Sequence, residues 1–231
     1  MYGPGIAPGF FILTGRRRMT ACSIDLILFD FGGVLAEEGF VNGLKAMAVM
    51  NGLDPDTMVK TGFQTVHDTG FVVGRADEAT FWHEIRRRTG IRQDDTTLRQ
   101  EMLSRFVLRT WMFEIIRDIR SHGVQVGILS DQTLWLEELD DRFDFFRWFD
   151  HVFSSYHMGK SKRDPSIFDD IAGTLNLKPG GILFIDDHEG NCKRARSRAL
   201  KTILYVDEEQ FLRELKGICF FVDTRLYNVF M

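Results

Sequence analysis

A short apolar run, DLILFD, ends at Asp30 and is followed at once by Phe31-Gly32-Gly33-Val34. Two further apolar runs end in the same way, VQVGILS at Ser130-Asp131 and ILFID at Asp186-Asp187. In an open parallel sheet, ligands gather outside the carboxyl ends of the strands. The pattern therefore predicts a sheet whose strands deliver acidic and hydroxyl groups to one edge.

Strand and helix patterns alternate along most of the chain. The expected strands are short and apolar: Asp25–Asp30, Val124–Ser130, His151–Ser154, Ile182–Asp186 and Thr202–Val206. Helical patterns lie between or beside them: Trp111–His122, Leu134–Asp141, Pro165–Asn176 and Glu189–Leu200. Strands buried on both faces and separated by helices predict an α/β fold with a parallel sheet and right-handed crossovers.

The alternation stops between about Phe40 and Thr110, where only helical periodicity is found. Asp77 is an expected N-cap for a helix that ends at Gly90, and Asp94 or Asp95 for the next helix. Helices inserted directly after the first strand would lie above the carboxyl ends of the strands, where a lid belongs.

These patterns predict a division of the chain into three parts. We expect a core made of residues 21–38 and 111–231 and a helical cap made of residues 39–110. Residues 1–20 are interpreted as a disordered extension or a start-codon artefact, with Met19 as the alternative beginning.

Composition narrows the class of protein. The chain has 231 residues, 44% of them hydrophobic and 27% charged, as in a soluble globular protein. A net charge of −4 gives no basic excess for a general nucleic-acid binder, and no apolar run reaches the roughly 18 residues of a membrane span. Cys22, Cys192 and Cys219 have no metal-like spacing, so we expect reduced thiols and a cytoplasmic location.

Taken singly, each polar strand end has an ordinary structural explanation. Asp30 is suited to a turn, Ser130 to a helix cap, and Lys162 to a solvated loop. Taken together and in this order, they favour phosphoryl transfer. Asp30 would attack phosphorus and form an aspartyl-phosphate, a known use of a carboxylate nucleophile. A divalent cation would relieve the repulsion between the converging acids.

Magnesium takes oxygen ligands and usually only one or two carboxylates, so we expect Mg²⁺ as the cofactor. Asp30 and Asp187 would supply carboxylates, Asp186 would act as a direct or indirect partner, and the backbone carbonyl of Gly32 would be a third ligand. The groups expected to hold a small phosphorylated substrate are Ser130, Asp131, Gly33 and neighbouring backbone N–H groups. Lys162 would neutralise charge on Asp30 and on the transferring group.

The four motifs FDFGGVL, ILSDQT, GKSKRDPSIF and FIDDHEGNCKRA, in this order, resemble those of the haloacid dehalogenase (HAD) superfamily. The resemblance covers about Leu26 to Gly217. It implies a Rossmann-like core and, in the subfamily with a C1-type helical cap, a cap where the helical segment lies here. It also implies Asp30 as nucleophile, Ser130 as phosphate binder, Lys162 as the third-motif lysine, and Asp187 with Asp186 on magnesium.

Gly32 departs from this family pattern, because the phosphatases normally carry a second aspartate two residues after the nucleophile. That aspartate protonates the leaving group and then activates water. Asp131, Glu37 and His188 are the candidates to replace it; Asp131 is also suited to a cap, and Glu37 to a solvated surface position. General acid catalysis contributes about 10²–10⁴-fold, so its loss would slow poor leaving groups severely.

Three functions therefore stay open. A magnesium-dependent phosphatase acting on a small phosphorylated metabolite is favoured, because the Asp186-Asp187 pair suits a metal. A 2-haloacid dehalogenase-like hydrolase also lacks the second aspartate, but its chemistry needs no metal. A HAD protein with weakened catalysis that binds a phosphorylated ligand or a partner protein is the third. The sequence gives no indication of the oligomeric state.

Overall fold

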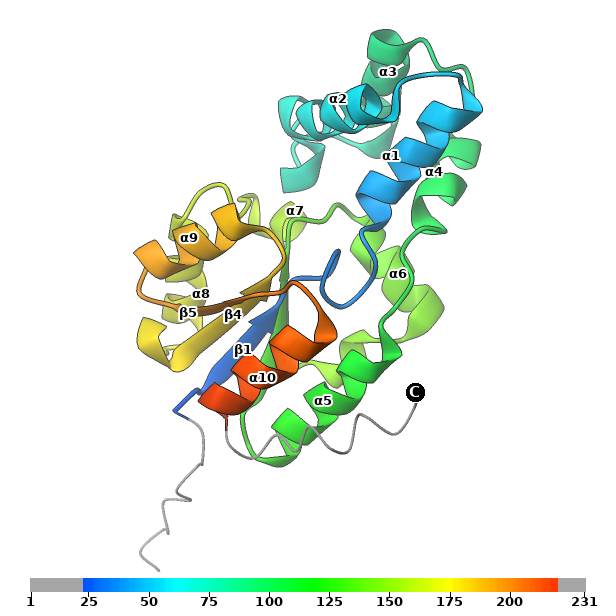
Figure 1. The fold of residues 1–231 in the computed structure, drawn as a ribbon. Coiled ribbons are helices and arrows are strands. Elements are labelled where there is room, and N and C mark those ends of the chain that lie inside the picture. Colours follow the sequence, from blue (N-terminus) through cyan, green and yellow to red (C-terminus); the bar gives the residue numbers. More distant parts are fainter. Residues whose placement is uncertain (1–22, 220–231) are drawn as a thin grey trace, which may run out of the picture.

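The computed structural model describes residues 23–219, and its centre is a parallel sheet of five strands in the order β3-β2-β1-β4-β5 (Figure 1). The strands are β1 (Leu26–Phe29), β2 (Gln125–Ser130), β3 (His151–Ser154), β4 (Ile182–Asp186) and β5 (Lys201–Leu204). Each lies within two residues of its predicted range. The strand order reverses beside β1, so β1 is central and its carboxyl end faces the crevice expected in such sheets.

Helices cover both faces of the sheet (Figure 1). One face carries α8 (Ser166–Thr174) and α9 (Glu189–Ser197), and the other carries α5 (Thr110–Ser121), α6 (Trp135–Phe143) and α10 (Glu208–Ile218). Side chains of β1 alternate between these layers: Leu26 and Leu28 pack with α8, whereas Ile27 and Phe29 pack on the opposite face. The predicted α/β, Rossmann-like fold is confirmed.

Four α-helices and a short 3-10 helix separate β1 from α5. The α-helices form what we call the helical insertion: α1 (Gly39–Met50), α2 (Pro55–Asp68), α3 (Glu78–Thr89) and α4 (Asp95–Leu103). They stand beyond the carboxyl ends of the strands (Figure 1). Asp77 caps α3 by accepting from the Thr80 N–H at 2.8 Å. Asp94, rather than Asp95, caps α4. A mobile cap made of residues 39–110 stays a prediction.

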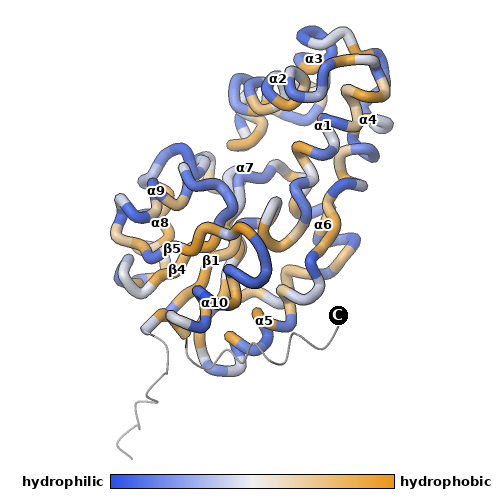
Figure 2. Tube along the Cα trace, viewed as in Figure 1, coloured by the Kyte–Doolittle hydropathy of each residue, from blue (hydrophilic) through white to orange (hydrophobic). Residues whose placement is uncertain are grey.

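Aromatic contacts join the helical insertion to the core. Trp82 of α3 stacks on Trp135 of α6 with ring centroids 5.6 Å apart. Phe31, directly after the nucleophile candidate, stacks on Phe106 at 5.8 Å and on Phe145 at 5.0 Å. Figure 2 shows hydrophobic residues along the strands and hydrophilic ones on much of the outer helical surface. The insertion and one face of the sheet therefore share a single hydrophobic cluster.

The cysteines differ from the prediction. Cys192 is free and buried, and burial raises the pKa of its thiol to about 12. Cys219 is disulfide-bonded, so the expectation of a reduced thiol is wrong at this position. Cys22 and the predicted extension of residues 1–20 lie outside the described residues. Since disulfides are uncommon in reducing compartments, the cytoplasmic location stays a prediction.

No helix described between residues 23 and 219 combines the length and the apolar character needed to cross a membrane.

Candidate active site

Neighbouring strands bring the predicted acids together at the carboxyl edge of the sheet. Asp30 directly follows β1, and its N–H donates to the carbonyl of Ile185 at 2.8 Å, which places it beside Asp186 at the end of β4. One carboxylate oxygen each from Asp30, Asp186 and Asp187 lie within 4.8 Å of one another. Ser130, on the opposite side of β1, ends β2 and is buried. The structure therefore assembles the acidic cluster that the strand ends predict.

Lys162 is the cation of this cluster. Its Nζ lies 2.7 Å from Oδ2 of Asp30 and 2.6 Å from Oδ2 of Asp186, and only 1% of the residue is exposed. Burial opposes the charge of Lys162, but the surrounding carboxylates of Asp186, Asp30 and Asp131 outweigh it and raise the lysine pKa. The ammonium group is thus held charged between the two acids.

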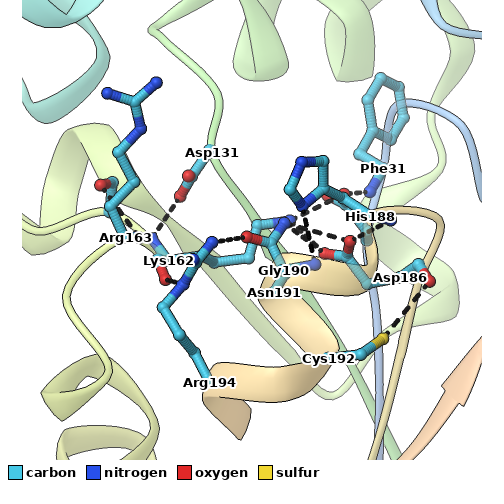
Figure 3. A network of polar contacts seen from close by, with 12 residues as sticks. Phe31, Asp131, Lys162, Arg163, Asp186, His188, Gly190, Asn191, Cys192 and Arg194 are labelled. Atoms are coloured by element: carbon cyan, nitrogen blue, oxygen red, sulfur yellow. Dashed lines mark hydrogen bonds and ion pairs between the residues drawn. The ribbon is translucent and has the colours of Figure 1, made fainter.

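The backbone of Lys162 is fixed from both sides (Figure 3). Its N–H donates to Oδ1 of Asp131 at 2.8 Å, and its carbonyl accepts from Nε of Arg194 at 2.6 Å. Asp131, which was predicted to bind substrate, therefore holds the backbone of Lys162 in place. Figure 3 shows the loop that carries Lys162 and the start of α9 meeting at Asp186.

The charges of the cluster are not balanced by Lys162 alone. Burial raises the pKa of Asp30 well above its usual value, Lys162 opposes this rise, and Asp186 and Asp187 add to it. At Asp187, loss of surrounding water raises the carboxyl pKa, and the charge of Asp186 raises it further. Three carboxylates around one ammonium group favour a further cation.

The donor set fits Mg²⁺, which prefers oxygen ligands and commonly uses one or two carboxylates. Both oxygens of Asp186 are already engaged: Oδ1 accepts from the His188 N–H at 2.8 Å, Oδ2 contacts Lys162, and Nδ2 of Asn191 reaches both. Both oxygens of Asp30 are engaged as well, since Oδ1 accepts from the Phe31 N–H at 2.7 Å and Oδ2 contacts Lys162. The predicted division, with Asp30 and Asp187 as carboxylate ligands and Asp186 as a direct or indirect partner, therefore stays a prediction.

The backbone hydrogen bonds that close the turn after β1 do not involve the Gly32 carbonyl. The N–H of Gly33 donates to Ala36 at 2.8 Å, and the carbonyl of Phe31 accepts from Ala36 at 2.9 Å. Gly32 itself is buried at the edge of the cluster. That the Gly32 carbonyl is a metal ligand stays a prediction.

Gly33 has a structural reason to be glycine. Its φ is +82°, and a Cβ on this residue would lie 2.0 Å from Oδ2 of Asp187. Its N–H is bonded to Ala36, and its carbonyl accepts from Arg109. Because both polar groups are used within the protein, Gly33 holds the turn against Asp187, and the structure gives no support for its predicted contact with substrate.

The three residues considered as replacements for the missing second aspartate make other contacts within the protein. Glu37 is exposed and pairs with Arg109 at 3.1 Å. Nδ1 of His188 accepts from the Gly190 N–H at 3.1 Å and caps α9. Asp131 holds the backbone of Lys162, as described above.

Glu38, which the sequence analysis did not single out, reaches the position left open by Gly32. Its Oε1 lies 3.0 Å from where a Cβ on Gly32 would be. Its Oε2 is buried and has no hydrogen-bond partner among the described residues. Burial raises the pKa of the Glu38 carboxyl to about 7, the charge of Asp187 adds to the rise, and the Val41 N–H opposes it.

Comparisons with known proteins agree with this geometry. Residues 24–197 match the family described as haloacid dehalogenase-like hydrolase. The chain belongs to this family. Bifunctional epoxide hydrolase 2 of Rattus norvegicus is 29% identical over 126 residues, which cover 52% of this chain and 22% of the rat protein. The chain therefore spans about a fifth of the length of that relative.

Solved structures show the same fold. A HAD family enzyme of Bacteroides thetaiotaomicron has a TM-score of 0.69 at 22% identity, covering 83% of this chain and 98% of the enzyme. The wild-type enzyme has also been crystallised with magnesium and inorganic phosphate. L-2-haloacid dehalogenase of Xanthobacter autotrophicus, with chloropropionic acid covalently bound, has a TM-score of 0.60 at 15% identity, covering 88% of this chain and 86% of the dehalogenase.

Proposed function

We propose that this HAD-like hydrolase is a magnesium-dependent phosphatase that hydrolyses a small phosphorylated metabolite through an aspartyl-phosphate on Asp30. The observation that carries the proposal is the buried contact of Lys162 with both Asp30 and Asp186, beside the accessible carboxylate of Asp187. A cluster with this excess of negative charge suits a metal and a phosphoryl group. The magnesium and phosphate complex of the Bacteroides relative supports the same assignment.

The residues divide the chemistry between them. Asp30 supplies the nucleophilic oxygen, and Lys162 stabilises the charge on that oxygen and on the phosphoryl group. Ser130, at the end of the adjacent strand, would donate its hydroxyl to a phosphate oxygen. When bound, Mg²⁺ would be held by Asp30, Asp187 and the Gly32 carbonyl and would stabilise the developing negative charge of the phosphoryl group.

Assay of the magnesium-loaded protein with p-nitrophenyl phosphate tests the function. We expect the Asp30→Asn variant to lose at least about 10³-fold in kcat, because the amide is a poor nucleophile. The fold of this variant in the absence of magnesium is followed by circular dichroism and is expected to stay intact. Undiminished turnover in this variant would contradict the assignment of Asp30.

A dehalogenase is the second candidate, because Gly32 leaves this chain without the second aspartate of the phosphatases. The same protein preparations are therefore assayed for halide release from 2-haloacids in the absence of metal. Halide release that depends on Asp30, without phosphate release, would favour the dehalogenase. Binding of a phosphorylated ligand with neither activity would favour a HAD protein without catalysis.

A further inference from the structure

We infer that Glu38 performs the proton transfers that the second aspartate performs in related phosphatases, although it lies six positions beyond Gly32 in the chain. The inference rests on the proposed phosphatase function. It assigns a catalytic residue that the motifs of this sequence do not contain.

The position of the carboxyl group is the main argument. A side chain at position 32 would begin at a Cβ whose nearest neighbours are Oε1 of Glu38, at 3.0 Å, and Nε2 of Gln132, at 3.8 Å. Gly32 therefore creates a space beside the acidic cluster that the Glu38 carboxyl group fills. An aspartate at position 32 would place its own carboxyl group in the same region.

Glu38 stands at the N-cap of α1, where the Val41 N–H of the first helical turn interacts with its carboxyl group and favours the charged form. Its Oε2 is buried without a hydrogen-bond partner among the described residues. A buried polar atom without a partner costs free energy, so its retention points to a partner that arrives with the substrate.

The proposed reaction has two steps. A carboxylate oxygen of Asp30 bonds to phosphorus, the bond from phosphorus to the ester oxygen breaks, and that oxygen takes the electron pair and the proton of Glu38. In the second step the Glu38 carboxylate takes a proton from water as the water oxygen bonds to phosphorus. The bond to Asp30 then breaks with its electron pair returning to Asp30. The products are an alcohol or phenol and inorganic phosphate, and Glu38 is again protonated.

The test compares two substrates of similar shape, p-nitrophenyl phosphate and phenyl phosphate, in the Glu38→Gln variant. Phenol is the poorer leaving group and depends more on a general acid. We expect kcat/KM to fall at least about tenfold more for phenyl phosphate than for p-nitrophenyl phosphate. Because water activation is also lost, kcat for p-nitrophenyl phosphate falls after a burst of one product per protein.

Matched variants separate catalysis from structure. Glu114→Gln makes the same change at an exposed glutamate of α5, whose side chain pairs with Arg117, and is expected to keep the wild-type ratio between the two substrates. Gly32→Asp combined with Glu38→Gln restores a carboxyl group in the same space and is expected to recover phenyl phosphate hydrolysis. Position 32 has no positive φ, and the end of the flexible Glu38 side chain can give way.

Three results for Glu38→Gln would overturn the inference. These are an equal loss of kcat/KM with both substrates, no loss with either, and a changed magnesium requirement with an unchanged ratio between the substrates. If Glu38→Gln does not fold, Glu38→Asp and the double variant take its place, and a folded double variant without recovery also overturns the inference. An inactive Asp30→Asn variant beside an unaffected Glu38→Gln variant keeps the phosphatase and rejects Glu38. Wild-type protein that hydrolyses neither substrate rejects both.

Discussion

At the residue scale, Lys162 carries the charge balance of the candidate active site. It is buried, and its ammonium group contacts two of the three clustered carboxylates. Asp131 and Arg194 fix its backbone, and the contacts with Asp30 and Asp186 hold its ammonium group between the two acids. Removal of one member of a buried charge cluster leaves the others uncompensated, which is costly.

We therefore predict that Lys162→Met lowers the free energy of unfolding by about 3–5 kcal/mol in the absence of magnesium and abolishes turnover. Added magnesium should recover part of the stability, because it replaces part of the lost positive charge. Denaturant unfolding with and without Mg²⁺ measures both effects. Lys193→Met is the control, since Lys193 is exposed on α9 and only loosely paired with Glu189 at 3.8 Å. Equal stability of the two variants would contradict this role of Lys162.

Glu37 and Glu38 show why one residue of the site was missed. The sequence indicates an acidic pair between the β1 turn and the first helix, but neighbouring side chains in extended backbone face opposite sides. Which acid faces the cluster depends on the bonds of Ala36 with Phe31 and Gly33, and on the pairing of Glu37 with Arg109. Tertiary contacts of this kind cannot be read from residue spacing.

At the element scale, the turn after β1 positions the site. Arg109, at the start of α5, donates to the carbonyls of Gly33 and Val34 and pairs with Glu37. This arginine ties the end of the helical insertion to the loop that follows Asp30. The turn and the loop after β4 then meet where Gly33 faces Asp187.

Gly33→Ala is predicted to displace Asp187, because the added Cβ would lie 2.0 Å from its Oδ2. We expect the magnesium concentration for half-maximal activity to rise about tenfold or more, since ligand geometry controls affinity. Gly123→Ala is the matched control: Gly123 also has a φ of +82°, but a Cβ there meets nothing within 4 Å. Both variants carry the same backbone strain. An equal magnesium requirement in the two would therefore contradict the proposed displacement of Asp187 by the added Cβ.

The elements themselves were largely predictable. Each strand is an apolar run closed by a polar residue or a turn, and the caps at Asp77 and Asp94 follow from local hydrogen bonding. The acidic strand ends predict the cluster of Asp30, Asp186 and Asp187, because parallel strands place their carboxyl ends on one edge. Composition could not distinguish the free Cys192 from the disulfide-bonded Cys219, because the pairing of cysteines depends on the folded chain.

At the scale of the whole molecule, the helical insertion and the core share an open pocket of about 370 Å³. Its walls include His67 of α2, Arg75, and Arg163 of the loop that carries Lys162. Burial lowers the pKa of His67 to about 4, with the charge of Arg163 as a further cause, so this side chain is neutral at pH 7. Figure 3 shows Arg163 extending away from Asp186. Lys160 and Asp164 also line the pocket, so its charged side chains are three basic residues and one acid, and we propose that it holds an additional anionic group of the substrate.

We predict that Arg163→Ala raises KM for a phosphorylated carboxylic acid such as 3-phosphoglycerate about threefold to fivefold, as expected for an exposed charge interaction. KM for phenyl phosphate, which has no second anionic group, should stay unchanged. Arg117→Ala serves as the control, because Arg117 lies on α5 and pairs with Glu114. A similar change in KM for both substrates would argue against recognition of an anion in this pocket.

Transfer of the phosphoryl group to Asp30 is the most direct test of the account. Magnesium-loaded Glu38→Gln protein is mixed with p-nitrophenyl phosphate, quenched in acid within the burst, and digested for peptide mass spectrometry. We expect a phosphoryl group on the peptide that contains Asp30, and none in the corresponding Asp30→Asn protein. Turnover by wild-type protein with the phosphoryl group on another residue, or undiminished in Asp30→Asn, would contradict it.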